Sequence, residues 1–147
     1  MMADTNMIWI AANRSGNSVS AQRRVTFALL ATVLAKKNYN IDTERVYLSG
    51  FSGGGRIASE IAPAYPQLFN GAIYHCGVNF WNEAPTNLEL VRNNRFVFIT
   101  GSEDFNRRET RRIFGAYQKA GVDKVTLIDV THMGHSLSAV ADLRQAV

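Results

Sequence analysis

One serine of this chain lies in a setting that would make it a nucleophile. The run Gly50-Phe51-Ser52-Gly53-Gly54 follows the apolar stretch 46–48 and precedes residues 56–62, which favour a helix. This is the spacing of the G-x-S-x-G nucleophile elbow, in the strand-turn-helix context that gives the motif its meaning. A serine on so tight a turn has a strained backbone, and small neighbours let strand and helix approach closely. The pattern predicts an exposed, reactive hydroxyl at Ser52.

A serine hydroxyl is a weak nucleophile unless a base and an orienting acid stand beside it. The chain offers both farther downstream. Asp104 follows the apolar run 96–99, and His135 follows the apolar run 125–128. Each is therefore expected just past the end of a strand, where the carboxyl ends of parallel strands form one rim.

Other acids compete with Asp104 for the orienting role, which is to hold the ring nitrogen that faces away from the serine. Glu103 lies at the same turn and is expected to be solvated. Asp129 alternates with Ile128 in a predicted strand and is expected to pair with a nearby base.

Two histidines compete for the role of base. His135 is preferred because the preceding Gly134 would let the loop bring the imidazole to the serine, whereas His132 is expected to be packed or at the surface. A zinc site built from His132, His135 and a carboxylate is an alternative, but two histidines three residues apart are weak evidence for one. His75 precedes Cys76 on a predicted strand and is interpreted as structural.

The order Ser, Asp, His along the chain is the one that α/β-hydrolases use, and the sequence resembles that superfamily from about Met7 onward. Within it, the stretch 40–55, NIDTERVYLSGFSGGG, is similar to esterases grouped with polyhydroxybutyrate depolymerases and feruloyl esterases. The resemblance implies a serine esterase that hydrolyses carboxylic esters through an acyl-enzyme. Ser52 would be the nucleophile, His135 the general base and Asp104 the acid that fixes the imidazole tautomer. No cofactor and no metal are implied.

The resemblance also assigns the surroundings of the serine. The backbone N–H of Gly53 would supply one oxyanion donor. Tyr74 is open to either a pocket or a core position, whereas an aromatic pair in a polar loop favours a pocket or lid. The Asn13 side chain or a neighbouring N–H could replace the second oxyanion donor, which the family supplies from a loop that this sequence lacks. The residues expected to bind the substrate are Asn13, Phe51, Phe80 and Trp81.

An α/β-hydrolase normally has three strands before the first one predicted here, and the loop after the third of them carries the second oxyanion donor. The expected fold is therefore a truncated α/β-hydrolase. It would be a single partial domain over residues 1–147, with about five mostly parallel strands and helices on both faces. Its activity is expected to be weak because that loop is absent.

In the family's strand order a gap would lie beside the strand 45–49. Unpaired backbone groups at such an edge are costly and favour association. Three remedies are open: the first strand slides over, a second copy supplies the edge, or the chain is a fragment of a longer one. A homo-oligomer through the incomplete sheet edge is the expected outcome.

The remaining elements follow from apolar runs and helix breakers. Helices are expected over about 20–37, from residue 56 to near Pro63, over 107–120 with Gly121 as a left-handed cap, and from Ser136. Strands are expected over 7–12, 45–49, 71–76, 96–100 and 124–130, with a short helix around 88–91.

Composition limits the partners. The net charge of +4 comes from 16 basic and 12 acidic residues, and four arginines at helical spacing predict a solvated stripe beside Glu109 instead of a nucleic-acid groove: Arg107, Arg108, Arg111 and Arg112. A single cysteine, Cys76, excludes an intramolecular disulfide and predicts a buried thiol. No apolar run approaches ~18 residues and no signal peptide is evident, so neither a membrane nor a nucleic-acid partner is expected and the default location is cytoplasmic.

Three other functions compete with an esterase. The first is a weak or inactive hydrolase-like module that binds a ligand or partner, and the second is a peptidase of the same superfamily. The third is nucleotide binding, since 50–55 has the spacing G-x-x-x-x-G. Arg56 and Ile57 follow, where a phosphate loop needs Lys and Ser or Thr, so nucleotide binding is disfavoured.

Overall fold

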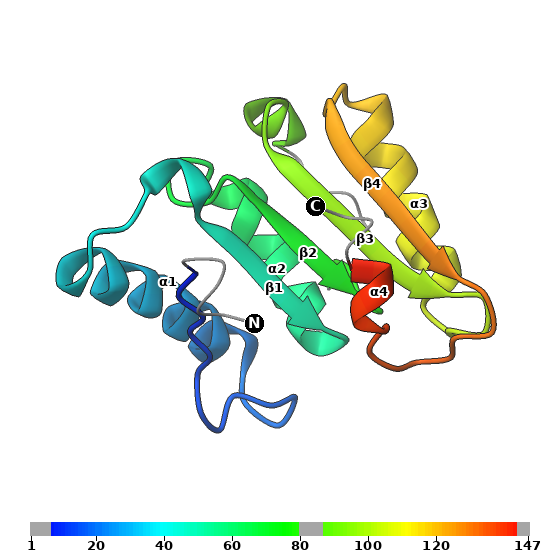
Figure 1. Cartoon of the computed structure of the whole chain (residues 1–147), viewed down its shortest axis with the longest axis horizontal. Coiled ribbons are helices and arrows are strands. Elements are labelled where there is room, and N and C mark those ends of the chain that lie inside the picture. The colour runs from blue at the N-terminus through cyan, green and yellow to red at the C-terminus, as the bar shows by residue number, and fades with distance from the viewer. Residues whose placement is uncertain (1–6, 80–86, 144–147) are drawn as a thin grey trace. The chain divides into compact units, whose positions relative to one another are not determined.

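The computed structural model describes residues 7–79 and 87–143 (Figure 1). The chain divides into two compact units, residues 1–41 and residues 42–147. That both belong to one domain stays a prediction.

The first unit contains one long helix, α1 (Ala21–Asn38). Ser20 caps it, since its hydroxyl accepts a hydrogen bond from the Arg23 N–H at 3.4 Å, and Lys36 and Lys37 fall in the last turn, where positive charge suits the helix dipole. The helix agrees with the range predicted from the sequence.

The strand predicted over residues 7–12 is wrong. This segment has no strand assignment, and the side chains of Ile8 and Trp9 are about half exposed instead of buried. An extended apolar run becomes a strand only when a neighbouring strand accepts and donates its backbone hydrogen bonds. The described sheet does not include this segment.

The second unit is built on a parallel sheet of four described strands in the order β1-β2-β3-β4. The fold is a truncated α/β-hydrolase type, as predicted, although the described strands number four instead of about five. The strands are β1 (Tyr47–Phe51), β2 (Gly71–His75), β3 (Arg95–Gly101) and β4 (Lys124–Val130).

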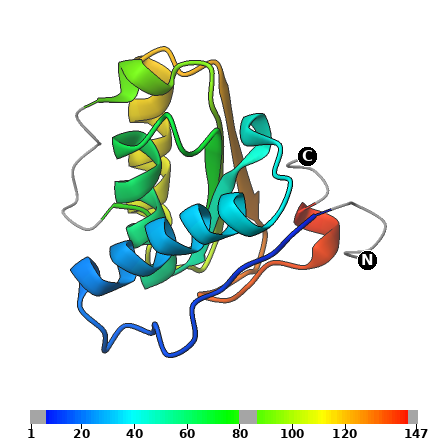
Figure 2. The same cartoon turned by 90° about the vertical axis from the view of Figure 1, so that its left-hand side faces the viewer.

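Helices lie on both faces of this sheet. Figure 2 shows α2 (Gly53–Ala64) and α3 (Arg107–Lys119) on one side and the short α4 (Val140–Leu143) on the other. Two single-turn 3₁₀ helices, η2 (Thr43–Arg45) and η3 (Leu88–Val91), complete the elements. No helix in the described ranges is long and apolar enough to cross a membrane.

Helix ends largely follow local chemistry. Gly121 has φ 77° and follows α3, so the predicted left-handed cap is confirmed. Pro63 lies inside α2, which ends one residue later at Ala64. A proline this close to the end removes only one hydrogen bond of the helix, so the helix can include it. The last helix begins at Val140 instead of Ser136.

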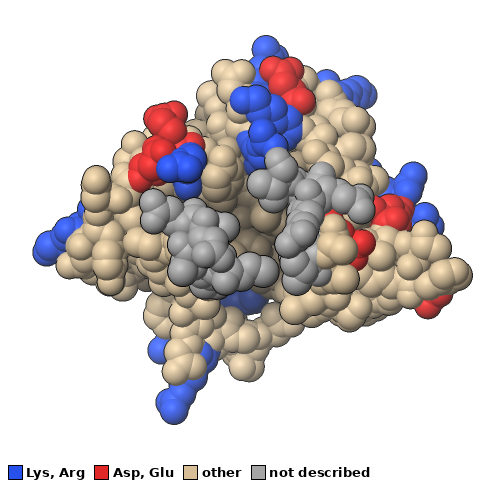
Figure 3. Space-filling view, in the orientation of Figure 1, with Lys and Arg blue, Asp and Glu red and all other residues tan. Residues whose placement is uncertain are grey.

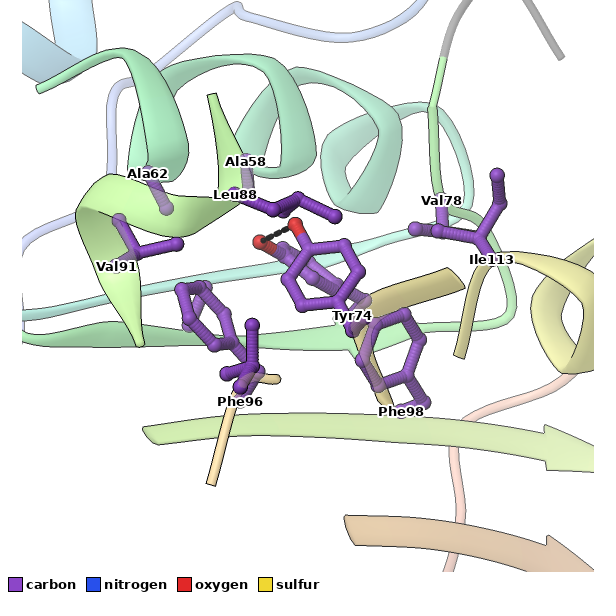
Figure 4. Packing of buried hydrophobic residues seen from close by; sticks show 12 residues of the cluster. Ala58, Ala62, Tyr74, Val78, Leu88, Val91, Phe96, Phe98 and Ile113 are labelled. Atoms are coloured by element: carbon purple, nitrogen blue, oxygen red, sulfur yellow. Dashed lines mark hydrogen bonds between the residues drawn. The ribbon is translucent and has the colours of Figure 1, made fainter. Parts of the chain in front are cut away.

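The main core lies between the sheet and the pair α2 and α3. Its centre is aromatic: Tyr74 and Phe98 pack edge to face at 5.1 Å, and the Tyr74 and Tyr117 hydroxyls are 3.2 Å apart (Figure 4). Because both tyrosines are fully buried, each hydroxyl satisfies the other. Tyr74 is therefore a core residue and does not line a pocket.

A second apolar cluster covers the opposite face near the carboxyl ends of the strands. It contains the buried residues Cys76, Val97, Ile99, Ile128 and Met133. Cys76 is buried, as predicted. This cluster supports the segment after β4, because Met133 belongs to that segment.

Charged side chains occur in small groups that mix both signs, and Figure 3 shows no single basic patch on the face it displays. The predicted arginine stripe is only partly solvated. Arg107 and Arg111 both pair with Asp129, at 3.1 and 2.5 Å, so Asp129 pairs with bases as expected. Glu109, beside which the stripe was expected, has a side chain that is only 12% exposed and pairs with Arg56.

Candidate active site

Ser52 occupies the turn between β1 and α2 in a conformation that L-residues rarely adopt, with φ 52° and ψ −117°. Its N–H donates to the His75 carbonyl at 2.7 Å, and its carbonyl accepts from the Arg56 N–H at 3.1 Å. Although Ser52 is the N-cap residue of α2, its hydroxyl makes no cap hydrogen bond. The turn therefore holds the backbone rigidly and leaves the hydroxyl available for chemistry.

Two glycines make room for this turn. A Cβ at Gly50 would lie 2.2 Å from the Gly54 carbonyl carbon, and a Cβ at Gly77 would lie 2.2 Å from the Ser52 carbonyl oxygen. No side chain fits at either place. The close approach of strand and helix expected from the motif is thus present.

The three side chains singled out in the sequence form one hydrogen-bonded chain. His135 Nε2 is 2.8 Å from Ser52 Oγ, and His135 Nδ1 is 2.8 Å from Asp104 Oδ1. Asp104 has no exposed side-chain surface, whereas the His135 side chain keeps 20% of its exposure. The acid is therefore enclosed and the imidazole reaches solvent.

Asp104 is held as a carboxylate by several donors. Burial by itself would raise its pKa, but hydrogen bonds from His135, the Asn106 N–H and Thr100 bring the pKa below its usual value. Thr100 Oγ1 donates to Oδ2 at 2.8 Å, and the Asn106 N–H donates to Oδ1 at 3.1 Å. With Asp104 ionised, His135 Nδ1 carries the proton and Nε2 is free to accept one from Ser52.

The loop that carries His135 is fastened to the end of β2. The Ser138 N–H donates to His75 Nε2 at 3.0 Å, and the Cys76 thiol donates to the Ser136 carbonyl at 3.4 Å. Burial lowers the pKa of His75, against the opposing charge of Asp104, so its imidazole stays neutral and can accept. Burial raises the pKa of Cys76 to about 12, so its thiol stays protonated and can donate.

Two phenyl rings pack against the imidazole of His135. Phe105 stacks on it with ring centroids 4.1 Å apart, and Phe51 lies 5.0 Å away at a tilt. Phe105 itself remains 76% exposed. The sequence analysis missed Phe105, for which the only signal was an aromatic residue directly after the acid.

The other predicted site residues divide into three groups. Phe51 lies beside His135, and Gly53 is the first residue of α2. Asn13 belongs to the first unit, so its relation to Ser52 stays a prediction. Phe80 and Trp81 lie outside the described residues.

The competing side chains have partners of their own. His132 Nδ1 is 3.3 Å from Glu103 Oε1, on an exposed part of the loop. Each histidine of this loop therefore faces its own carboxylate. Cys76, Asp104 and His135 place ligand atoms within 4.8 Å of one another, a grouping that could hold a metal, although two of the three already serve the hydrogen-bonded chain to Ser52.

The parallel sheet with its helices defines the fold of an α/β-hydrolase. Residues 3–101 match the family model described as Esterase PHB depolymerase, and the chain belongs to this family.

Curated relatives carry the same chemistry in their names. The chain is similar to acetylxylan esterase A of Emericella nidulans, with 35% identity over 75 residues that cover 49% of this chain and 22% of the relative. It is also similar to a probable acetylxylan esterase A of Aspergillus flavus, with 35% identity over 66 residues, 45% of this chain and 19% of the relative. The matches thus span about a fifth of the length of these relatives.

Solved structures share the fold. An uncharacterised protein from Bacillus cereus superposes with a TM-score of 0.75 at 19% identity, over 99% of this chain and 51% of that one. A thermostable esterase gives a TM-score of 0.63 at 21% identity, over 75% of this chain and 29% of that one.

Proposed function

We propose that this chain is a serine esterase that hydrolyses carboxylic esters through an acyl-enzyme. The observation that supports this most directly is the chain of two 2.8 Å hydrogen bonds from Ser52 through His135 to Asp104. The strained turn at Ser52 supports it as well, because it separates the hydroxyl from any cap role. Membership of an esterase family points to the same bond type.

The proposed reaction begins when Ser52 Oγ attacks the ester carbonyl and passes its proton to His135 Nε2. The ionised Asp104 stabilises the imidazolium that forms. The imidazolium then protonates the leaving alcohol, and the acyl group stays on Ser52. A water molecule then gives a proton to His135 and attacks the acyl carbonyl. The bond to Ser52 Oγ breaks, the carboxylic acid leaves, and His135 returns the proton to Ser52 Oγ.

We assign stabilisation of the oxyanion to the backbone N–H of Gly53, which would donate a hydrogen bond to it. This group is at the N-terminal end of α2, where N–H groups lack carbonyl partners within the helix and the dipole favours negative charge. Loss of one oxyanion donor typically lowers turnover by ~100- to 1000-fold. With only Gly53 assigned, we expect activated esters with a small acyl group to be the best substrates, a choice supported by the acetylxylan esterases among the relatives.

The test compares wild type, Ser52→Ala and Ser49→Ala with p-nitrophenyl acetate as substrate. Ser49 is an exposed serine on the same strand, so it is a matched control. We expect Ser52→Ala to lose ~10⁴-fold or more of the enzymatic rate, while Ser49→Ala keeps it. A fluorophosphonate should modify Ser52 stoichiometrically in the wild type.

Hydrolysis that persists in Ser52→Ala would remove this mechanism. Absence of both labelling and Ser52-dependent turnover would favour the rival function, a hydrolase-like module that only binds a ligand.

We also propose that the chain forms a homo-oligomer through β1. Within the described part of residues 42–147, β1 pairs only with β2, and Tyr47 and Phe51 on it are exposed. An unpaired strand edge invites pairing with a second copy. Light scattering coupled to size exclusion should give at least a dimer mass, and a monomer at all concentrations would contradict the proposal.

A further inference from the structure

Arg56 lies four residues after Ser52, and its guanidinium joins α2 to the segment after β2 and to the start of α3. It donates to the Asn79 carbonyl at 2.5 Å, to Asn106 Oδ1 at 3.1 Å and to Glu109 Oε1 at 3.0 Å. The side chains of Arg56 and Glu109 keep only 23% and 12% of their exposure. An ion pair this enclosed needs further hydrogen bonds to offset its loss of hydration. Here the guanidinium also donates to two neutral acceptors, the Asn79 carbonyl and Asn106 Oδ1.

Asn106 continues this connection to the acid. Its side-chain Nδ2 donates to the Cys76 carbonyl at 2.8 Å while its Oδ1 accepts from Arg56, so both ends of the amide are occupied. Its backbone N–H donates to Asp104 Oδ1, the same oxygen that faces His135. The position of the Asn106 side chain therefore sets the position of the N–H that orients the carboxylate.

Arg56 is tied as closely to the serine. Its N–H donates to the Ser52 carbonyl in the first turn of α2. A short path thus runs from Ser52 to Arg56, on to Asn106 and then to Asp104, without passing through His135.

We propose that Arg56 and Asn106 are positioning residues, which fix the spacing between Ser52 and Asp104 so that one imidazole can reach both. This inference rests on the proposed esterase function. His135 spans two contacts of 2.8 Å each, and a displacement of about 1 Å in such a constellation can lower the rate ~100-fold. Glu109 neutralises the guanidinium, so the network fixes geometry without placing a net positive charge beside the acid.

The geometry calls for arginine specifically. Its planar fork offers donors in several fixed directions, and here three acceptors on two segments use them, whereas a lysine ammonium has one nitrogen and lacks the fork. Arg56→Lys should therefore keep an ion pair with Glu109 but lose the hydrogen bond to Asn106 Oδ1. Asn106→Ala removes the link at its other end and keeps the backbone N–H.

The control is Arg111→Lys. Arg111 is also an ion-paired arginine and lies on α3, but its partner is Asp129 on β4, at the other end of the described strand order from β1. We expect this variant to retain wild-type kinetics.

The experiment measures kcat and KM for p-nitrophenyl acetate across pH for wild type and the three variants. In Arg56→Lys and Asn106→Ala we expect kcat to fall by ~10- to 100-fold with KM little changed, because substrate contacts are untouched. The acid limb of kcat/KM should move to lower pH, because a misplaced carboxylate stabilises the imidazolium less.

A second readout does not depend on turnover. Proton NMR of the wild type should show a far-downfield resonance from the His135 Nδ1–H that faces Asp104. We expect it to broaden or disappear in Arg56→Lys and to stay sharp in Arg111→Lys. If Asn106→Ala fails to fold, Arg56→Lys still decides the question.

A lowered melting temperature with unchanged kcat, pH profile and downfield resonance would overturn the inference, since the network would then only staple α2 to α3. Failure of the esterase proposal would look different: the wild type itself would show no Ser52-dependent turnover and no fluorophosphonate adduct. The downfield resonance would still report on the positioning.

Discussion

At the scale of single residues, the candidate site is arranged around His135. The imidazole has a hydrogen-bond acceptor on one nitrogen, a hydroxyl on the other and a phenyl ring, Phe105, stacked on its face. Two contacts set the direction of the ring, and the stacking sets its tilt. We therefore expect Phe105 to affect the reaction although it supplies no polar group.

Phe105→Ala tests this expectation. Aromatic pairs of this kind contribute about 0.5–1.5 kcal/mol, so kcat/KM for p-nitrophenyl acetate should fall by roughly 2- to 10-fold. The free energy of unfolding in urea should fall by no more than the same ~0.5–1.5 kcal/mol, the energy of the lost contact, because Phe105 is 76% exposed and buries little other surface. Leu90→Ala is the control, since Leu90 is 62% exposed on η3. Equal kcat/KM values for wild type and Phe105→Ala would show that the stacking has no kinetic role.

The sequence predicted which residues converge but not what holds them. Ser52, Asp104 and His135 could be singled out because each follows an apolar run, and strand ends meet at one rim. Arg56, Asn106 and Phe105 act through contacts between α2, the acid turn and the loop after β4. No local pattern encodes such contacts, and the pairing of Glu109 with Arg56 was not predicted for the same reason.

At the scale of elements, the close packing of β1 against the start of α2 requires a residue without a side chain at Gly50. A Cβ at Gly50 would collide with the backbone of Gly54, whereas a Cβ at Gly54 would meet nothing within 4 Å. The two glycines therefore differ in kind: one is required by space, and the other lies in an open part of the first helical turn.

Replacing each glycine with alanine separates these situations. For Gly50→Ala, overpacking against backbone should lower the free energy of unfolding by at least the upper end of the usual ~1–3 kcal/mol. For Gly54→Ala, the helix should be unaffected or stabilised by up to about 1 kcal/mol, since alanine is the better helix former. Urea unfolding followed by circular dichroism measures both. Similar stability of the two variants would mean that strand and helix can separate without cost.

Element boundaries were predictable where the signal was local. The strand over 124–130 and the cap at Gly121 were found as predicted, because alternation and a left-handed glycine are short-range features. The strand over 7–12 was wrong because pairing, which a single segment cannot encode, decides whether an apolar run joins a sheet.

At the scale of the whole molecule, stability and the site share two titrating groups. The pKa of His75 is lowered from its ordinary 6.5, chiefly by burial, and the pKa of Asp104 is lowered from 3.8, because donors outweigh burial. In both cases the unfolded chain binds a proton at a pH where the native chain does not. Stability therefore falls with decreasing pH, first below about 6.5 through His75 and then below about 4 through Asp104.

The two windows can be separated with one substitution. His75→Gln keeps an amide oxygen that can accept from the Ser138 N–H but removes the titration, so its free energy of unfolding should change less between pH 7 and pH 5 than that of the wild type. Both proteins should lose stability alike below pH 4, where Asp104 takes up its proton. Urea titrations at pH 7, 6, 5 and 3.5 measure this. If the wild type and His75→Gln lost the same free energy between pH 7 and pH 5, protonation of the buried imidazole would not be the cause of that loss.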